Sequence, residues 1–538
     1  MTGLDTPLTP LRFLQRAAEV MPDKVAVVDG TREWTYLQFR DEVQTLARAL
    51  RQGGVTDGER VAYLATNSAE LLIAHYAVPL ARGVLVAINT RLSPSEIEYI
   101  CRHSEAMLLF GEPDLMGPLQ DVALNFPTVT EWIELPHTSA GTDARFTDYA
   151  SVLRRGDGAA EIAWEVDDET RTISINYTSG TTGRPKGVMY SHRGAYLSSL
   201  GTLHHSGFTR ESKYLWTLPM FHCNGWCATW AVTAALATHV CLRAVRAESV
   251  WALIDEHEIT HLSGAPTVLA ILHEADEAHT LPTSLTIING GAPPSPTIIA
   301  AMQALGATVV HAYGLTETYG PYAICEPQPQ WNEIDPQARA ALMARQGVGI
   351  ITSNGVRVVR KLRGPDGALI DVTPDGREMG EIVMSGNGVM KGYYKDESAT
   401  RTATEGGWFH SGDLGVMHPD GYVQLLDRAK DVVISGGENI STVEVEHAIS
   451  SHPAVLEVAV VGTPDERWGE RTKAIIIVRR GFSVDAEQII AHVKSRLASF
   501  KSPKIVDFVS ELPKTSTGKI RKNELREMEW KTRVAKIN

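Results

Sequence analysis

Residues 177–188 read Tyr177-Thr178-Ser179-Gly180-Thr181-Thr182-Gly183-Arg184-Pro185-Lys186-Gly187-Val188. Three glycines, four Ser/Thr hydroxyls and two cations in twelve residues favour neither a helix nor a strand. Glycine lets backbone N–H groups turn toward a ligand, hydroxyls donate to phosphate oxygens, and the two cations add positive charge. The β-branched, alternating residues 172–176 predict a strand that leads into this stretch. Its composition is that of a polyanion cradle, with an ordinary surface loop as the alternative.

A Walker P-loop does not fit this stretch, because Pro185 stands where that motif, counted from Gly180, needs its second glycine. The string instead resembles the phosphate-binding signature of the adenylate-forming superfamily, which includes acyl-CoA synthetases, firefly luciferase and nonribosomal peptide adenylation domains. The resemblance implies catalytic roles for Thr178 and Lys186, with Thr178 also near the metal. It further implies ATP contacts from Thr178, Ser179, Gly180, Thr181, Thr182, Gly183 and Lys186.

The length and the net charge of the chain limit the number of domains and the class of partner to be expected. A chain of 538 residues is too long for one core, so two or more domains are expected. The net charge of −13 argues against a general nucleic-acid binder. Residues 431–538 nevertheless carry 17 Lys and Arg against 15 Asp and Glu, a net of +2. We expect either a solvated basic tail or a basic end that meets a phosphorylated ligand.

The N-terminus lacks the basic start and apolar core of a signal peptide, and the longest apolar-leaning run is too short to span a membrane. These features predict a cytoplasmic protein without a membrane span. Five cysteines, odd in number and mostly in apolar settings, predict reduced thiols.

The order of the predicted elements indicates an α/β fold. Strands at 60–64, 84–88, 213–218, 239–243 and 260–263 alternate with helices at 68–78, 192–200, 225–237 and 248–257, which predicts layered subdomains on parallel sheet. Around 343–430 short β-rich pieces between Asp-Gly turns predict an antiparallel or barrel-like subdomain. A compact α+β pattern follows. We therefore expect a large N-terminal AMP-binding domain, 1–429, and a small mobile catalytic domain, 430–538.

Two further motifs complete the predicted nucleotide site. After a Gly-containing turn, Glu317 is the natural magnesium anchor beside a triphosphate loop, although a lone Glu is more often a surface residue. An aspartate such as Asp413 can accept from ribose hydroxyls, although turns also favour Asp for structural reasons. The resemblance implies a catalytic role for Glu317. It also implies nucleotide contacts from Gly291, Ala292, Pro293, His311, Tyr313, Gly314, Thr316, Asp413 and Arg428.

Residues 513–522, Pro-Lys-Thr-Ser-Thr-Gly-Lys-Ile-Arg-Lys, form either a solvated basic tail or a catalytic segment. They resemble the C-terminal catalytic motif of the superfamily, which implies that Lys519 reaches the acyl carboxylate and the α-phosphate. A preorganised cation stabilises charge that builds during in-line attack. The resemblance also places Lys430 at the hinge, and Gly436 and Gly437 along the path of the coenzyme A thiol.

The acid pocket is expected around residues 219–226, Pro-Met-Phe-His-Cys-Asn-Gly-Trp. Amino-acid adenylation domains place an Asp where this chain has His222, which disfavours an amino acid substrate and makes His222 a candidate catalytic residue. A short or medium-chain fatty acid or an aryl acid suits an apolar, aromatic wall. The expected lining is His222, Asn224, Gly225, Trp226, Gly264, Gly290, Tyr319 and Pro321.

Together the motifs predict an ATP-dependent carboxylate–CoA ligase with ATP, Mg²⁺ and coenzyme A as cofactors, most like medium-chain and methylmercaptopropionate-type ligases. An adenylate-forming enzyme with another acid or nucleophile, for example in nitrite-dependent diazotisation, is the alternative. A homologue that has lost catalysis would show damaged motifs, and these motifs are intact. A homodimer is compatible with the sequence.

Overall fold

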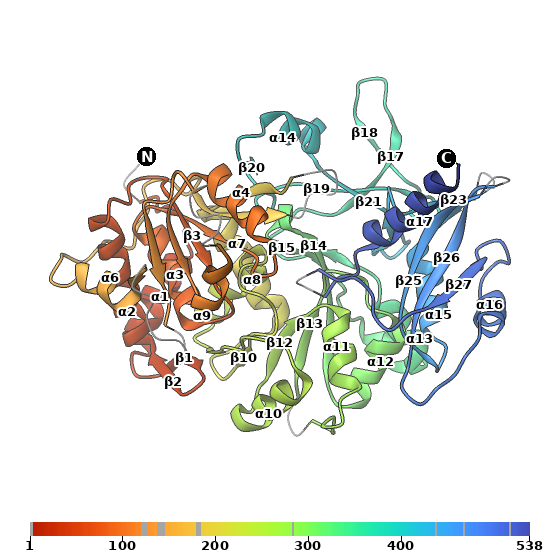
Figure 1. Cartoon of the computed structure of the whole chain (residues 1–538), viewed down its shortest axis with the longest axis horizontal. Coiled ribbons are helices and arrows are strands. Elements are labelled where there is room, and N and C mark those ends of the chain that lie inside the picture. Colours follow the sequence, from red (N-terminus) through yellow and green to blue (C-terminus); the bar gives the residue numbers. More distant parts are fainter. Residues whose placement is uncertain are drawn as a thin grey trace.

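The computed structural model describes residues 4–119, 126–136, 146–178, 184–281, 284–435, 438–465, 468–515 and 518–537. Figure 1 shows the chain running from an N-terminal body (red to yellow) through a central green region to a C-terminal body (blue) at the opposite end. The described strands form four sheets.

The first sheet is parallel in its middle and antiparallel at both ends. Its spatial order is β16 (Val348–Gly349), β15 (Gly320–Ile324), β14 (Thr308–Leu315), β13 (Thr286–Asn289), β12 (His261–Gly264), β10 (Lys213–Leu215), β11 (Thr238–Val240), β1 (Val25–Asp29) and β2 (Arg32–Thr35). The parallel strands all end at one edge, which is where α/β sheets bind their ligands.

The second sheet places β9 (Lys186–Ser191), which follows the Gly-rich stretch, between β8 (Thr172–Thr178) and the distant strand β20 (Gly392–Tyr393). Its order is β20, β9, β8, β4 (Val84–Ala87), β3 (Arg60–Leu64), β5 (Ala106–Gly111), β6 (Glu131–Glu134) and β7 (Thr147–Asp148). Strands β8 and β9 pair antiparallel on either side of residues 179–185, and β20 pairs with β9.

The last two sheets are smaller. An antiparallel sheet has the order β18 (Leu369–Asp371), β17 (Arg357–Arg363), β19 (Gly380–Met384), β21 (Phe409–Met417) and β22 (Val423–Arg428). The C-terminal sheet has the order β24 (Glu438–Ile440), β23 (Val433–Ser435), β26 (Gly469–Val478) and β25 (Val455–Asp465), with β27 (Ile505–Phe508) also paired to β26. It has a core of its own that includes Val433, Val460, Ile476 and Val493.

The helices begin at the capping signals of the sequence. Ser93 and Glu96 form a capping box at the start of α4, and Thr35 and Gln38 form another at α2. The described helices are α1 (Leu11–Val20), α2 (Tyr36–Gln52), α3 (Ala69–Leu80), α4 (Pro94–Ser104), α5 (Pro113–Met116), α6 (Tyr149–Arg155), α7 (His192–Ser206), α8 (Cys223–Trp226), α9 (Ala228–Ala234), α10 (Ala247–His257), α11 (Pro266–His273), α12 (Pro296–Ala304), α13 (Pro336–Met343), α14 (Glu397–Ala403), α15 (Thr442–Ser450), α16 (Ala486–Lys494) and α17 (Lys522–Ile537), with 3₁₀ turns at Thr316–Thr318, Pro329–Glu333 and Glu405–Gly407.

One helix differs from the prediction. The pattern of residues 225–237 predicts a continuous helix, but regular α-helix runs only over α9. Residues 223–227 have positive φ angles of 48°, 45°, 59°, 52° and 60°, so they cannot continue a right-handed helix.

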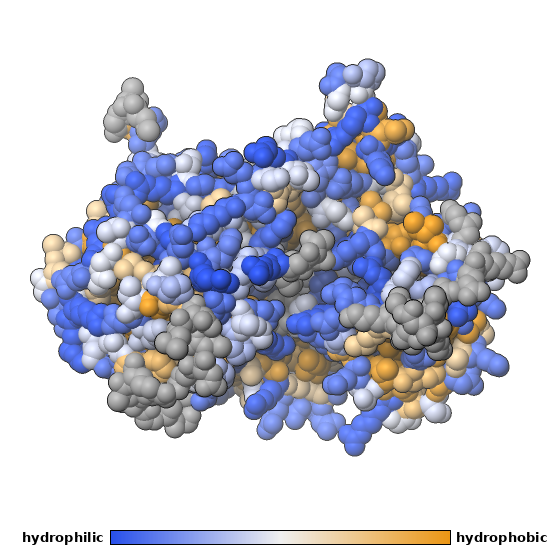
Figure 2. Space-filling model, turned by 45° about the horizontal axis from the view of Figure 1, so that its top comes forward, coloured by the Kyte–Doolittle hydropathy of each residue, from blue (hydrophilic) through white to orange (hydrophobic). Residues whose placement is uncertain are grey.

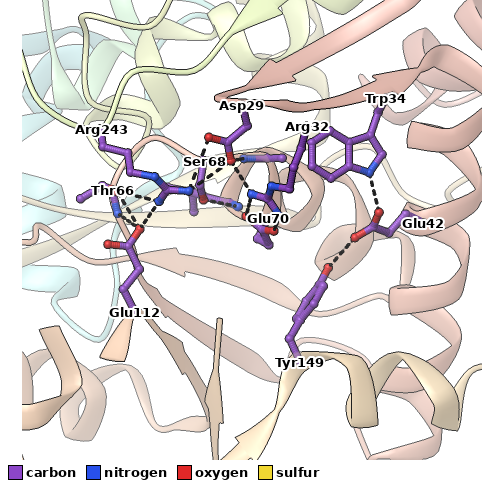
Figure 3. Close-up of polar contacts among 12 residues, drawn as sticks. Asp29, Arg32, Trp34, Glu42, Thr66, Ser68, Glu70, Glu112, Tyr149 and Arg243 are labelled. Atoms are coloured by element: carbon purple, nitrogen blue, oxygen red, sulfur yellow. Dashed lines mark hydrogen bonds and ion pairs between the residues drawn. The ribbon is translucent and has the colours of Figure 1, made fainter. Parts of the chain in front are cut away.

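A network of buried carboxylates and partly exposed arginines joins the first two sheets (Figure 3). Arg243, which follows β11, pairs with Asp29 at the end of β1 at 3.2 Å and with Glu112 after β5 at 2.9 Å. Arg32 pairs with the same Asp29 at 2.6 Å and also contacts Glu70 on α3. Buried carboxylates are tolerated when a cation pairs with them, so this network fixes how the two sheets meet.

The predicted fold class is confirmed: layered α/β subdomains and a β-rich subdomain precede a separate C-terminal α+β unit. Figure 2 shows a largely hydrophilic face, with hydrophobic colour gathered on the C-terminal side. Large exposed hydrophobic side chains of that side include Ile434, Phe482, Phe500 and Phe508.

Candidate active site

A cavity of about 960 Å³ lies between the C-terminal body and the rest of the chain, which we call the large body. Its walls come from the ends of β13, β14 and β15, from β20, β21 and β22, and from Thr515 and residues 518–524. The fold therefore brings together segments that lie more than three hundred residues apart in the sequence. The predicted residues that line this cavity are Thr178, Lys186, His222, Trp226, Gly291, Ala292, Pro293, His311, Tyr313, Gly314, Thr316, Glu317, Pro321, Asp413, Arg428, Lys430 and Lys519.

Asp413 is fixed by two neighbours. It lies on β21 opposite Arg428 of β22, whose Nε is 3.5 Å from Asp413 Oδ1. The hydroxyl of Tyr313, at the end of β14, donates to Asp413 Oδ2 at 2.7 Å. These two contacts orient the carboxylate in the cavity, which suits it to accept hydrogen bonds from hydroxyl groups of a ligand.

Glu317 lies in the 3₁₀ turn that follows β14, and its Oε1 accepts a hydrogen bond from Tyr393 at 2.9 Å. Burial raises the pKa of the Glu317 carboxyl, which Tyr393 partly offsets. Lys186 Nζ lies 4.8 Å from the centre of the Tyr393 ring. Tyr393 thus contacts both Glu317 and Lys186, the carboxylate and the cation that the sequence analysis places at the nucleotide site.

Lys519 is carried by a tight hairpin in which Lys514 and Ile520 form a β-bridge. Gly518 has φ +83°, and a Cβ on it would lie 2.2 Å from Thr267 Oγ1 on α11. Only glycine allows this approach of the hairpin to the large body. Burial, with a contribution from Arg428, lowers the pKa of Lys519 to about 7.

A second set of contacts crosses the junction near residue 430. Asp427 of β22 accepts from the backbone N–H and the hydroxyl of Thr442, both at 2.6 Å, at the first position of α15. Lys522 donates to Thr442 Oγ1 and pairs with Glu446, each at 2.7 Å. Burial opposes the charge of Lys522, but Glu446 and Asp427 raise its pKa. These contacts fix the segment that begins at Lys522, and with it the hairpin of Lys519, against α15 and β22.

His222 and Cys223 face the same cavity. Burial, with Lys519 nearby, lowers the pKa of His222 to about 4, so its imidazole is neutral. Burial raises the pKa of the Cys223 thiol to about 12, and its Sγ donates to Thr316 Oγ1 at 3.3 Å. All five cysteines lie within the described residues, and all are buried and free of disulfides.

Residues 223–227 form a left-handed turn, since five consecutive φ angles are positive. For a residue with a Cβ this conformation costs about 1–2 kcal/mol, and only Gly and, less often, Asn adopt it routinely. Four of the five residues are not glycine. Such strain persists only where the surroundings hold it, and it is typical of functional sites.

Not every predicted acid-pocket residue reaches the cavity in the part of the chain that the structure describes. Asn224 is fully buried in a polar network. Tyr319 stacks on Tyr190 at 4.0 Å, and its hydroxyl accepts from the backbone N–H of Ser191 at 2.7 Å. Gly225, Gly264 and Gly290 are packed against neighbouring side chains, and none of the three lines the cavity. Ser179, Gly180, Thr181, Thr182, Gly183, Gly436 and Gly437 lie outside the described residues.

The sequence reasoning missed several cavity residues. Tyr393 carries no motif, and only the pairing of β20 with β9 brings it to Glu317. Thr267 and Asp427 likewise gain their roles from contacts across the two bodies. Lys522, three residues after Lys519 in the basic segment, is the one with a signal in the sequence.

Two kinds of feature are absent from the described residues. No group of three or more His, Cys, Asp or Glu side chains there is arranged to hold a metal ion. None of the helices in that part of the chain has the length and apolar character that crossing a membrane requires.

Comparison with known proteins agrees with this geometry. The chain is 42% identical to the acetate–CoA ligase CCL3 of Humulus lupulus, over 97% of this chain and 94% of the relative. It is 40% identical to the peroxisomal trans-cinnamate:CoA ligase of Petunia hybrida, again over 97% and 94%. A crystal structure of the anthranilate CoA ligase AuaEII in complex with anthranoyl-AMP superimposes with a TM-score of 0.88 at 26% identity, covering 99% of both chains. The family model for the AMP-binding enzyme matches residues 14–394, and that for its C-terminal domain matches residues 444–519. This chain belongs to the AMP-binding enzyme family.

Proposed function

We propose that this protein is an ATP-dependent, AMP-forming carboxylate–CoA ligase. It joins a carboxylic acid to AMP with release of pyrophosphate, and then transfers the acyl group to the thiol of coenzyme A. The observation that carries the proposal is the position of Lys519, which reaches a cavity that also contains Asp413, Glu317 and His222.

The nucleotide occupies the part of the cavity between β14 and the β21–β22 pair. Asp413, held by Tyr313 and Arg428, accepts from the ribose hydroxyls. Gly291, Ala292 and Pro293 line the adenine side with small side chains. Thr178 and Lys186, at the two ends of the phosphate stretch, contact the triphosphate.

Magnesium fits this donor set. Mg²⁺ keeps several waters and takes one or two protein oxygens plus phosphate oxygens, rather than a protein cage. Glu317 and Thr178 supply one carboxylate and one hydroxyl. Burial raises the pKa of the Glu317 carboxyl, so a cation bound beside it would favour the ionised form. The ion, when bound, neutralises charge on the phosphates as pyrophosphate leaves.

Lys519 acts on the first step. The acid carboxylate attacks the α-phosphorus, the bond to the bridging oxygen breaks, and pyrophosphate departs. The Lys519 ammonium stabilises the negative charge that builds on the α-phosphate. Its pKa of about 7 without ligand rises once the anionic substrates are bound, so the group is a cation when it is needed.

We further propose that residues 430–538 move between the two steps, with Lys430 as the hinge. This unit has a hydrophobic core of its own, so it can move as one body. Its exposed Ile434 lies on a face that could turn toward the cavity in the second step. Gly436 and Gly437 are proposed to line the path of the thiol. The thiolate attacks the acyl carbonyl, and AMP leaves.

The acid is proposed to be a short or medium-chain or aryl carboxylic acid. Relatives named for acetate, 2-methylpropanoate and trans-cinnamate, each about 40% identical, support this class. His222, neutral in the cavity, and Pro321 contact the acid beside Trp226.

The test is pyrophosphate release across a panel of carboxylic acids, with and without coenzyme A. Lys519→Ala should lose most adenylation but still convert a supplied acyl-adenylate to the thioester. Lys514→Ala is the matched control, because Lys514 lies on the same hairpin and pairs with Glu457 instead of facing the cavity. Equal loss of both half-reactions in Lys519→Ala would show that the assigned role is wrong.

A further inference from the structure

One hydroxyl group lies where two helices of the C-terminal body begin. Thr442 is the first residue of α15, and Lys522 is the first residue of α17. Figure 1 shows both helices in the blue C-terminal body. Thr442 is fully buried, and Lys522 Nζ donates to its Oγ1 at 2.7 Å. This bond therefore joins the starts of two helices that lie 80 residues apart in the sequence.

The same hydroxyl group also contacts the large body. Thr442 Oγ1 donates to Asp427 Oδ2 at 2.6 Å, and the backbone N–H of Thr442 donates to the same oxygen at 2.6 Å. Asp427 lies on β22, before the proposed hinge at Lys430, so it belongs to the large body. Its carboxylate lies at the N-terminus of α15, where negative charge is favoured. Thr442 Oγ1 therefore donates to one body and accepts from the other.

These three residues, Asp427, Thr442 and Lys522, form an interbody triad that is largely shielded from water. Asp427 is 3% exposed, and the Lys522 side chain is 17% exposed and also pairs with Glu446 at 2.7 Å. Hydrogen bonds in which one partner is charged are roughly twice as strong as neutral ones. A residue without a hydroxyl group at position 442 would remove one such bond from Asp427 and one from Lys522.

The interbody triad is close to the catalytic lysine along the chain. Lys519 and Lys522 are three residues apart, and both line the cavity. Between them, the backbone N–H of Arg521 donates to Pro513 O at 2.8 Å and closes the hairpin. On the other side of the triad, β22 pairs with β21, which carries Asp413. A shift of Lys522 relative to β22 therefore moves Lys519 relative to Asp413, and a small misplacement of a reacting group is costly.

We propose that Thr442 is a positioning residue for adenylation: its hydroxyl group bonds both bodies at once and so sets the Lys519 hairpin in register with the nucleotide held by the large body. The role belongs to the first step, because Thr442 leaves Asp427 when the C-terminal body turns about Lys430 for the second step. Thr442 does not line the cavity itself, so it acts through Lys519. The inference rests on the proposed ligase function and on the proposed movement of residues 430–538.

The test compares Thr442→Val with Thr442→Ser. Valine has nearly the shape of threonine without the hydroxyl group, and it keeps the backbone N–H that bonds Asp427. At saturating ATP and acid, Thr442→Val should slow single-turnover pyrophosphate release by about 10–100-fold, because two hydrogen bonds to charged groups are lost. Conversion of a supplied acyl-adenylate to the thioester should change by less than about twofold. Thr442→Ser keeps the hydroxyl group and should restore release to within about threefold of the wild type.

Thr472→Val is the matched control. Thr472 lies on β26 in the same C-terminal body, is 1% exposed, and donates from Oγ1 to Ser502 O at 3.2 Å. This substitution removes a buried hydroxyl group whose partner belongs to the same body. It should lower the Tm and leave the ratio of the two half-reaction rates unchanged. An equal fall of that ratio in Thr472→Val would assign the effect to loose packing of the C-terminal body and would overturn the proposal.

A double variant tests whether Thr442 acts through Lys519. In the Lys519→Ala background, Thr442→Val should have little further effect on pyrophosphate release, because the side chain that it positions is gone. Additive losses would overturn the proposal, even with a slow single variant. Equal losses in both half-reactions of Thr442→Val would also overturn it, and so would a Thr442→Ser variant that is as slow as Thr442→Val.

Hydrogen exchange separates this inference from the proposed function, because it needs no turnover. The backbone amides of Lys519 and Arg521 donate to Thr515 Oγ1 and Pro513 O within the hairpin. In the ligand-free full-length protein, Thr442→Val should speed exchange of the peptide that carries these amides by about fivefold or more, relative to the wild type and to Thr442→Ser. Faster exchange in Thr442→Val, with no adenylation of any acid by the wild type, would support the interbody triad and refute the ligase function. Unchanged exchange together with unchanged pyrophosphate release in Thr442→Val would refute the role of Thr442 alone.

Discussion

Gly518→Ala is expected to separate the two half-reactions. The new Cβ would lie 2.2 Å from Thr267 Oγ1 and 3.4 Å from Thr267 Cβ, and φ at this position is +83°. The backbone strain of about 1–2 kcal/mol acts on the hairpin wherever it lies. The overlap with Thr267 acts only while the hairpin contacts α11, and overpacking of this kind costs about 1–3 kcal/mol. Adenylation should therefore slow by a further factor of about 5–150 relative to thioester formation, at about 1.4 kcal/mol per tenfold.

Thr267→Ala supplies the internal control. It removes Oγ1 and leaves the nearest remaining atom, Cβ, at 3.4 Å, an ordinary contact. In the double variant the overlap disappears and the strain stays, so adenylation should recover most of the selective loss. Single-turnover pyrophosphate release measures the first step, and thioester formation from a supplied acyl-adenylate measures the second. Equal losses in both steps, or no recovery in the double variant, would refute the close contact between hairpin and α11.

Three further predictions follow from the site and the core. The free-enzyme pKa of Lys519 is about 7, so the cation is lost as pH rises and adenylation kcat/KM should fall above about pH 7. Lys519→Arg, if active, should show a flat profile there because arginine stays charged; the same fall in that variant would assign the titration to another group. Tyr393→Phe removes the 2.9 Å bond to Glu317 and should raise the Mg²⁺ concentration needed for half-maximal rate by roughly 5–30-fold, from about 1–2 kcal/mol. An unchanged Mg²⁺ titration would separate Glu317 from the metal. Arg243→Met leaves Glu112 and Asp29 short of a cation and should lower the free energy of unfolding by about 3 kcal/mol in urea, near the lower end for buried pairs because Arg243 is 31% exposed. Loss below about 1 kcal/mol would refute the reasoning that Glu112 and Asp29 depend on Arg243 for stability.

Local signals predicted much of the fold. The strand at 60–64 appears with its predicted bounds and the helix at 248–257 begins one residue earlier, because each depends on neighbours along the chain. The left-handed turn at 223–227 did not follow from its sequence. Its conformation depends on bonds from Asn224 to Ser174 and Asn176, about fifty residues away.

The candidate site also has a part that the sequence predicted and a part that depends on contacts between distant residues. The motifs named Lys519, Glu317 and Asp413 through resemblance, and the cavity gathers them from distant segments. What the sequence could not supply was the depth of the acid pocket, since that depends on which face of the cavity the Trp226 ring covers. The contact of Gly518 with Thr267 also needs the two bodies in place.

An acyl-adenylate is an acylating agent, and any thiolate within reach can intercept it. Cys223 lines the very cavity in which that intermediate would form. Its pKa of about 12, raised by burial, leaves almost none of it ionised near neutral pH. Burial therefore disfavours attack by Cys223 on the activated acyl group, which leaves that group to a thiol entering from solvent.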